Sequence, residues 1–174
     1  MKKFTLIAAA MMMMSAFAAA QVTSGGTLAV TATVNGTINL VFNSATGGVP
    51  LGNSGTNAAS LAFGTVQAFG GTLATGVTRT VGTGNFTVSS PFNVNVAKAN
   101  LTSANYTLKA NLTTADTTNT WQVGGVTVAS GAPATITGTG AFDSDNLFTL
   151  ALTIPFSATG TSISNTINFT AQAN

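Results

Sequence analysis

Residues 27–42 decide how the rest of this chain is interpreted, and their sequence is Thr-Leu-Ala-Val-Thr-Ala-Thr-Val-Asn-Gly-Thr-Ile-Asn-Leu-Val-Phe. A period of two in apolar residues is typical of a β-strand with one buried face. The stretch therefore predicts strand structure on both sides of Gly36, which is the only gap in the pattern. The apolar positions that share one face are Leu28, Val30, Ala32, Val34, Ile38, Leu40 and Phe42.

The same alternation recurs along the rest of the chain. It marks four further runs, at residues 92–96, 106–112, 148–154 and 163–170, with Gly-rich turn signals between them. Helical spacing is not sustained anywhere after residue 20. Many short strands with Gly-rich turns predict an all-β fold, a single immunoglobulin-like antiparallel β-sandwich of roughly seven to nine strands. Residues 43–60, rich in Gly, Ser and Asn, are expected to form a long surface loop.

The N-terminus has the features of an export signal. Lys2 and Lys3 precede a mainly apolar run at residues 4–17, and Ala18-Ala19-Ala20 supplies a small-residue cleavage site. We therefore expect a signal peptide at residues 1–20 and a secreted or cell-surface domain at residues 21–174. The alternative, a retained transmembrane helix, is disfavoured because the apolar run is shorter than the ~20 residues that span a bilayer. The mature part contains no longer apolar run.

The composition of the mature part narrows the possible functions. The chain has no histidine and no cysteine, and no glutamate, so the residues most used in acid–base, nucleophilic and metal chemistry are missing. After residue 20, three cations (Arg79, Lys98, Lys109) face three anions (Asp116, Asp143, Asp145). This balance argues against nucleic acid as a partner, because binding phosphates needs clustered cations. We expect neither enzyme activity nor a cofactor.

Two possible sites remain to be considered, a calcium-binding turn and a Ser–Lys dyad. Asp143-Ser144-Asp145-Asn146 has the alternating oxygen ligands that calcium prefers, but it lacks the glycine and the distal bidentate acid of a complete loop, so a solvated turn is favoured. A Ser–Lys dyad could use Lys98 or Lys109. Lys109, however, falls on the outward side of its run, whereas a catalytic lysine needs burial to lower its pKa.

Trp121 and Tyr106 are the only residues of their types. Exposed together, they could form a sugar-binding platform. A lone tryptophan in a small sandwich is more often part of the core or its rim, and the sequence does not show two aromatic residues exposed together.

Asn35-Gly36 is ordinarily a strong signal for a two-residue hairpin, but the phase of its neighbours opposes one here. In that hairpin Val34 and Thr37 would be paired and would point to the same face, although only one of them is apolar. Continuing straight through keeps all the apolar residues on one face. We therefore expect two collinear half-strands joined at a flexible point. Residues 27–34 would then either form the first strand of their own domain or insert into another copy.

Residues 26–40 resemble the mature start of major pilins of the alternate chaperone–usher class. Those proteins also lack cysteine, and they begin with a Val-Thr-Ala-Ser-Val-type donor strand, an Asp-Pro-type break and Ile-x-Leu. This chain has Asn35-Gly36 in place of Asp-Pro. Residues 61–66 and 167–171 are also similar to exported immunoglobulin-like proteins of the spore-coat-U type. The resemblance implies donor-strand complementation, in which an N-terminal extension completes the sheet of the next subunit.

These observations lead to one main functional hypothesis and one alternative. The main hypothesis is a structural subunit of an extracellular fibre or coat, which assembles with copies of itself through Leu28, Val30, Ala32 and Val34. The resemblance further implies a periplasmic chaperone and an outer-membrane assembly platform as partners. The alternative is a monomeric surface adhesin or carbohydrate-binding module.

Overall fold

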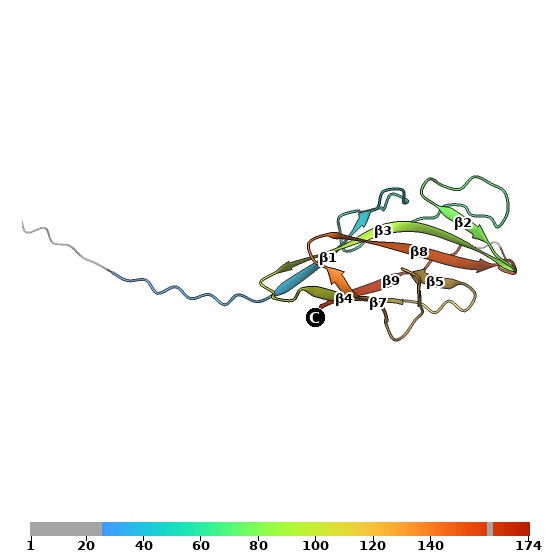
Figure 1. Ribbon diagram of the computed structural model, residues 1–174. Helices are drawn as coiled ribbons and strands as arrows, with labels where there is room; N and C mark the ends of the chain where they lie inside the picture. The colour runs from blue at the N-terminus through green and yellow to red at the C-terminus, as the bar shows by residue number, and fades with distance from the viewer. Residues whose placement is uncertain (1–25, 160–161) are drawn as a thin grey trace, which may run out of the picture. The chain divides into compact units, whose positions relative to one another are not determined.

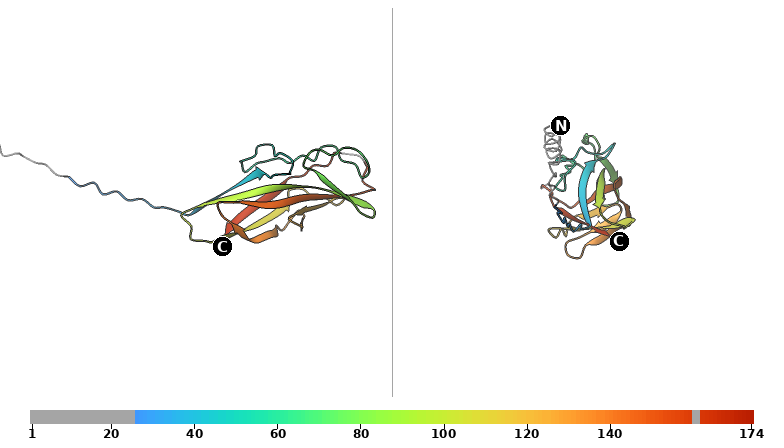
Figure 2. Two further views of the ribbon diagram at one scale, coloured as in Figure 1. Left: turned by 45° about the horizontal axis from the view of Figure 1, so that its top comes forward. Right: turned by 90° about the vertical axis from the view of Figure 1, so that its left-hand side faces the viewer.

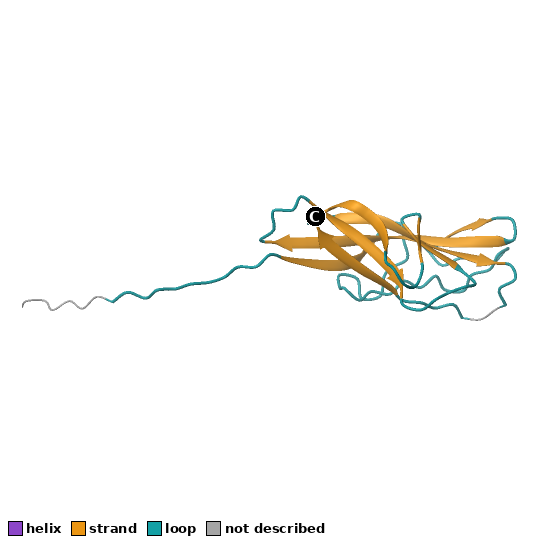
Figure 3. Cartoon of the chain, turned by 90° about the horizontal axis from the view of Figure 1, so that it is seen from below, coloured by secondary structure: helices purple, strands orange, loops and turns teal. Residues whose placement is uncertain are grey.

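The protein is seen in a computed structural model that describes residues 26–159 and 162–174, so the expected signal peptide at residues 1–20 lies outside the described residues. The described residues form nine β-strands and no helix (Figures 1 and 3). They are β1 (Thr37–Ser44), β2 (Thr78–Val81), β3 (Asn85–Ala99), β4 (Asn105–Leu112), β5 (Thr120–Val123), β6 (Val126–Val128), β7 (Ala134–Ala141), β8 (Asp145–Pro155) and β9 (Ile167–Ala173). The all-β prediction is therefore confirmed.

The strands form two antiparallel sheets that face each other (Figure 2). The larger sheet has the order β1-β3-β8-β5-β6, and β2 pairs with the part of β3 that β1 leaves free. The smaller sheet has the order β7-β4-β9. The strands β1 and β9 each end the order of their sheet. They lie on the same side of the sandwich, because they contact each other and the rings of Phe42 and Phe169 meet.

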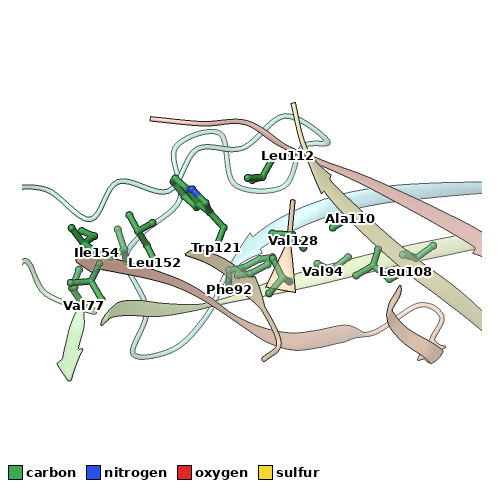
Figure 4. Packing of buried hydrophobic residues seen from close by; sticks show 14 of the residues in the cluster. Val77, Phe92, Val94, Leu108, Ala110, Leu112, Trp121, Val128, Leu152 and Ile154 are labelled. Carbon is green, nitrogen blue, oxygen red and sulfur yellow. The ribbon is translucent and has the colours of Figure 1, made fainter. Parts of the chain in front are cut away.

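The core lies between the sheets and follows from the alternation in β3 and β4. In β3 the residues from Phe86 to Val96 alternate between buried and half-buried, and in β4 every second residue from Tyr106 is buried. Inward side chains from both sheets meet in one cluster (Figure 4). Its members include Val88, Phe92, Val94, Val96, Tyr106, Leu108, Leu112, Trp121, Val123, Val128, Leu152 and Ile154.

Pro91 lies in the interior of β3 although proline cannot donate a ladder hydrogen bond. It is tolerated because β3 changes partner at this point. The β1 ladder ends at Phe92 and the β2 ladder begins at Ser89, so Pro91 falls between them. Pro155, by contrast, ends β8, which is the strand-end position expected of proline.

Residues 26–36 belong to no strand, although residues 27–34 alternate as a strand would. Asn35 and Gly36 do not have positive φ angles, so the tight turn that Asn-Gly often makes is not formed. Gly36 packs closely against the side chain of Leu101, where a Cβ atom would clash. The chain enters β1 from Gly36 without a hairpin, as the phase of the apolar residues predicted. The prediction of strand structure on both sides of Gly36 is confirmed for β1 but wrong for residues 27–34 in the single chain, because a strand needs a hydrogen-bonded neighbour and no described strand pairs with this segment.

Candidate functional site

A groove of about 1280 Å³ with a mainly apolar lining runs along the inner face of the sandwich. Part of it lies between β1 and β9, and it continues over the inner face of β8. Residues 61–66, called the strap below, and residues 162–166 lie along its rim. The apolar side chains that line it include Ile38, Leu40, Phe42, Leu61, Phe63, Val66, Val88, Phe92, Trp121, Leu150, Leu152, Ile154, Ile163, Ile167 and Phe169.

The strand β9 forms one wall of the groove and has an open edge. The N–H of Asn174 donates to the carbonyl of Asn105 at 3.1 Å, and the N–H of Thr113 donates to the carbonyl of Thr166 at 2.8 Å. In an antiparallel ladder the residues bonded to the partner alternate with those whose backbone groups point away. Thr166 is bonded to β4, so the residues out of phase with it direct their N–H and C=O groups away from β4. These residues are Ile167, Phe169 and Ala171. No described strand pairs with that side.

The strand β1 forms the other wall, and half of its outer edge is also open. The N–H of Phe42 donates to Thr56 at 2.9 Å and its carbonyl accepts from Gly55 at 2.7 Å, so the backbone of Phe42 faces away from β3. The same two-residue period directs the backbone groups of Ile38 and Leu40 to that side. The loop after β1 satisfies Phe42, and no described strand pairs with Thr37–Val41 there.

An aromatic cluster marks the place where the two walls approach each other. The rings of Phe42 and Phe169 meet edge to face with centroids 5.1 Å apart, and Phe92 lies 6.1 Å from Phe169. On β1 and β9 the same residues carry both an open backbone edge and an inward apolar side chain. Two sheet edges without a described partner strand therefore border the same groove.

The residues expected to fill such a groove are strongly exposed in the structure. Leu28, Val30 and Val34 have 89%, 80% and 69% of their surfaces accessible, and Ala32 is exposed as well. Exposed apolar side chains that share one face of a segment form the kind of surface that another molecule can cover. The groove residues could not be named from the sequence, although the alternating run at residues 163–170, part of which lines the groove, was visible there.

The two carboxylates considered for calcium are engaged separately. Asp143 accepts the backbone N–H of Lys98 at 3.1 Å. Asp145 accepts side-chain amide bonds from Asn43 at 2.8 Å, Asn95 at 3.1 Å and Asn93 at 3.4 Å. Both carboxylates therefore accept hydrogen bonds that join separate parts of the fold. The described residues hold no group of three or more His, Cys, Asp or Glu that could bind a metal ion.

The aromatic pair considered for sugar binding is buried. Tyr106 is 0% exposed and Trp121 is 7% exposed, so neither ring is available as a surface platform. Burial raises the pKa of Tyr106. Lys109 lies on the outward side of β4, and Lys98 places its ammonium group over the ring of Phe142, 4.9 Å from the centroid.

A hydrogen-bonded turn around Asp116 supports the end of the groove where Trp121 lies. Burial alone would raise the pKa of Asp116, but four hydrogen bonds outweigh it and lower the pKa from 3.8 to about 2. The donors are the N–H groups of Asn119 and Thr118, the amide of Asn119, and the Nε1 of Trp121 at 2.8 Å. The turn therefore fixes the orientation of the indole in the groove wall.

Comparisons with protein-family models, with curated proteins and with solved structures found no match to this chain. Within the described residues, no helix has the length and hydrophobicity needed to cross a membrane.

Proposed function

We propose that this protein is a structural subunit of an extracellular fibre or coat, in which residues 27–34 of one copy insert into the groove of the next. One observation carries the proposal: a groove bounded by two open sheet edges occurs in a chain that also has an unpaired, alternating apolar segment. Strand addition is an established mode of protein recognition, because backbone hydrogen bonds supply affinity and alternate side chains supply specificity.

The backbone pattern of the groove suits an inserted strand. A strand whose apolar side chains point inward can form hydrogen-bonded pairs with Ile167, Phe169 and Ala171, because paired residues in an antiparallel ladder point to the same face. The seven residues from Leu28 to Val34 match the seven residues of β9 in length. An insertion of this size would satisfy the open edge of β9 along its whole length.

Side-chain volumes favour one direction and one register. With the donor antiparallel to β9 and Ala32 opposite Phe169, the small donor residue meets the aromatic cluster. Val30 then meets the small Ala171, and Val34 meets Ile167. Alternating large and small residues in this way fills a core without overlap. The parallel direction would instead place Leu28 opposite the polar Asn165, which is held by its hydrogen bonds with Thr114.

The inserted side chains would hold the joint firmly. Burying each Val or Leu contributes about 1.5–3 kcal/mol, to which the ladder hydrogen bonds add. These contributions are offset in part by the entropy lost when an exposed segment becomes ordered. The balance favours a joint that dissociates slowly.

A second copy is a better source of the donor strand than the same chain. A two-residue hairpin at Asn35-Gly36 would turn the apolar donor residues to the outer face. A three-residue loop at residues 34–36 would restore the phase, but it needs a left-handed residue at its third position. Gly36 does not have a positive φ angle and is packed against Leu101. Folding back would therefore require that contact to be broken.

The proposal is tested by charging the two faces of the donor segment in turn. Val30→Asp with Val34→Asp places two carboxylates on the inward face, where they would be buried without partners. We expect this variant to be exported normally and to remain monomeric in size-exclusion chromatography. The matched control, Thr31→Asp with Thr33→Asp, adds the same charge to the outward face and should still polymerise. Polymers of the first variant would overturn the donor role.

A further inference from the structure

The strap, residues 61–66, lies on the groove in an unusual way. Leu61, Phe63 and Val66 are half-buried and pack against the core, whereas Ala62, Gly64 and Thr65 are exposed. The segment thus presents apolar side chains to the groove as a strand would. Yet among the described residues it belongs to no sheet, and its backbone groups have no hydrogen-bond partner in the protein.

Apart from this apolar packing, the strap is held by hydrogen bonds of the residues on either side of it. Before it, Ser60 and Gly52 exchange two backbone hydrogen bonds of 2.9 Å each. After it, the Nη1 of Arg79 donates to the carbonyls of Gln67 at 2.8 Å and Gly70 at 2.6 Å.

Arg79 is placed for this task by its strand. It lies opposite the buried Val88 in the β2–β3 ladder, so its side chain starts from the inner side of the sheet. A planar guanidinium is well suited to bond two carbonyl groups at once. In the same loop Phe69 packs against Phe156, with ring centroids 5.3 Å apart, although Phe69 is 68% exposed.

The residues that line the groove divide it into two parts. The part between β1 and β9 is bounded by the open edges, and the seven residues of β9 equal residues 28–34 in number. The part beyond the end of β1 runs over Val88, Leu152 and Ile154 and is bordered by the strap. Trp121, Leu152 and Ile154 lie toward the same end of the buried cluster, away from Leu108 (Figure 4).

We infer that the strap is a placeholder strand that covers the second part of the groove, and that Arg79 is the positioning residue that holds it there. The inference rests on the proposed function, because it assigns the open part to the donor and the covered part to the chain itself. Covering this apolar floor limits the exposed surface of a subunit that has not yet assembled. It also limits the length of the strand that the groove accepts.

The single tryptophan provides a direct test. Trp121 lines the groove together with the strap, so release of the strap would expose the indole to a small quencher. The measurement is acrylamide quenching of the mature chain carrying Val30→Asp and Val34→Asp, which removes self-assembly from the assay. In this background, Arg79→Gln should raise the quenching constant roughly two-fold or more, because a local opening is enough to expose the ring.

Two further variants control the result. Lys109→Gln changes the charge equally on a different strand, away from the strap, and should leave quenching unchanged. Phe63→Ser loosens the strap from its apolar seat without altering Arg79 and should raise quenching in the same way. Far-UV circular dichroism checks that each variant remains folded. If Arg79→Gln proves unfolded, Phe63→Ser decides alone, and equal quenching in this variant and its parent overturns the inference.

A second readout separates this inference from the proposed function. A labelled synthetic peptide of residues 26–36 is added to the same proteins, and its binding is followed by fluorescence anisotropy. Peptide binding together with unchanged quenching in Arg79→Gln would overturn the inference about the strap and leave the donor role standing. Increased quenching with no peptide binding to any variant would overturn the donor role and leave the Arg79 contact established.

Discussion

Gly140 faces Tyr106 across the β4–β7 ladder, and this pair shows how tightly the smaller sheet is packed. Tyr106 is completely buried, and a Cβ atom at residue 140 would overlap its ring. Two residues earlier in the same strand, Gly138 has no atom within 4 Å of the position of an added Cβ. Neither glycine has a positive φ angle, so the two positions differ in space rather than in backbone conformation.

This difference predicts opposite outcomes for the same substitution. Gly140→Ala should destabilise the fold by about 1–3 kcal/mol, the usual effect of overpacking a core. Gly138→Ala should be neutral or stabilising by up to about 1 kcal/mol, because alanine restricts the unfolded chain. Urea unfolding of both variants measures the difference. Equal stabilities would show that Tyr106 is not packed as the structure has it.

The lowered pKa of Asp116 predicts that the stability of the fold depends on pH. Because the folded state lowers its pKa from 3.8 to about 2, the ionised carboxylate stabilises the fold fully above pH 3.8, and that contribution is lost as the pH falls toward 2. Asp116→Asn should therefore be less stable than the wild type at pH 7, and the difference should disappear near pH 2. Unfolding curves at the two pH values test this. A difference that persists at pH 2 would contradict it.

At the scale of elements, the sequence predicted the strands that carry strong alternation. The runs at residues 38–42, 92–96, 106–112 and 148–154 all lie within observed strands. The run predicted at residues 163–170 is confirmed only from Ile167, where β9 begins, because the side chain of Asn165 bonds the backbone of Thr114 just before the strand. The strands β2, β5, β6 and β7 were not singled out, because three of them are only three or four residues long. The strand β7 is longer, but it is rich in Thr and Gly and has little apolar signal.

The groove could not be derived from local pattern. Its walls come from β1 and β9, which lie far apart in the sequence and in different sheets. Its rim comes from irregular segments, residues 57–66 and 162–166. Alternation shows which face of a strand is buried, but it does not show which edge lacks a partner, since that depends on the order of strands in each sheet. Residues 27–34 were visible in the sequence as a candidate donor, whereas the groove proposed to accept them could be seen only from the topology.

The proposed register gives a prediction for this pair of elements. Ala32→Phe places a large ring opposite Phe169 and should reduce polymer yield by about tenfold or more, since overpacking costs about 1–3 kcal/mol. Adding Phe169→Ala in the same chain should restore assembly, because the volumes then exchange sides. Sedimentation of polymers measures the yield.

The outward position next to it supplies the control for this register. Ala29→Phe adds the same ring to the opposite face of the donor and should assemble normally. A doubly substituted chain that assembles no better than Ala32→Phe alone would show that these two residues are not opposite each other.

At the scale of the whole molecule, each subunit would be both donor and acceptor. Such a contact joins two different surfaces, so repetition produces an open chain rather than a closed dimer. After residue 20 the sequence carries three cations and three anions, so copies of this part of the chain would not repel one another strongly at close range. A fibre or coat built in this way would depend on inserted strands rather than on disulfides, which this chain cannot form.

The most direct test of assembly by inserted strands is an SDS gel of the purified mature protein, with an unheated sample beside a heated one. Inserted strands held by buried side chains and ladder hydrogen bonds should resist the detergent at room temperature and separate on heating. We therefore predict a ladder of multiples in the unheated lane that collapses to a single monomer band in the heated lane. A single monomer band in both lanes would contradict the account.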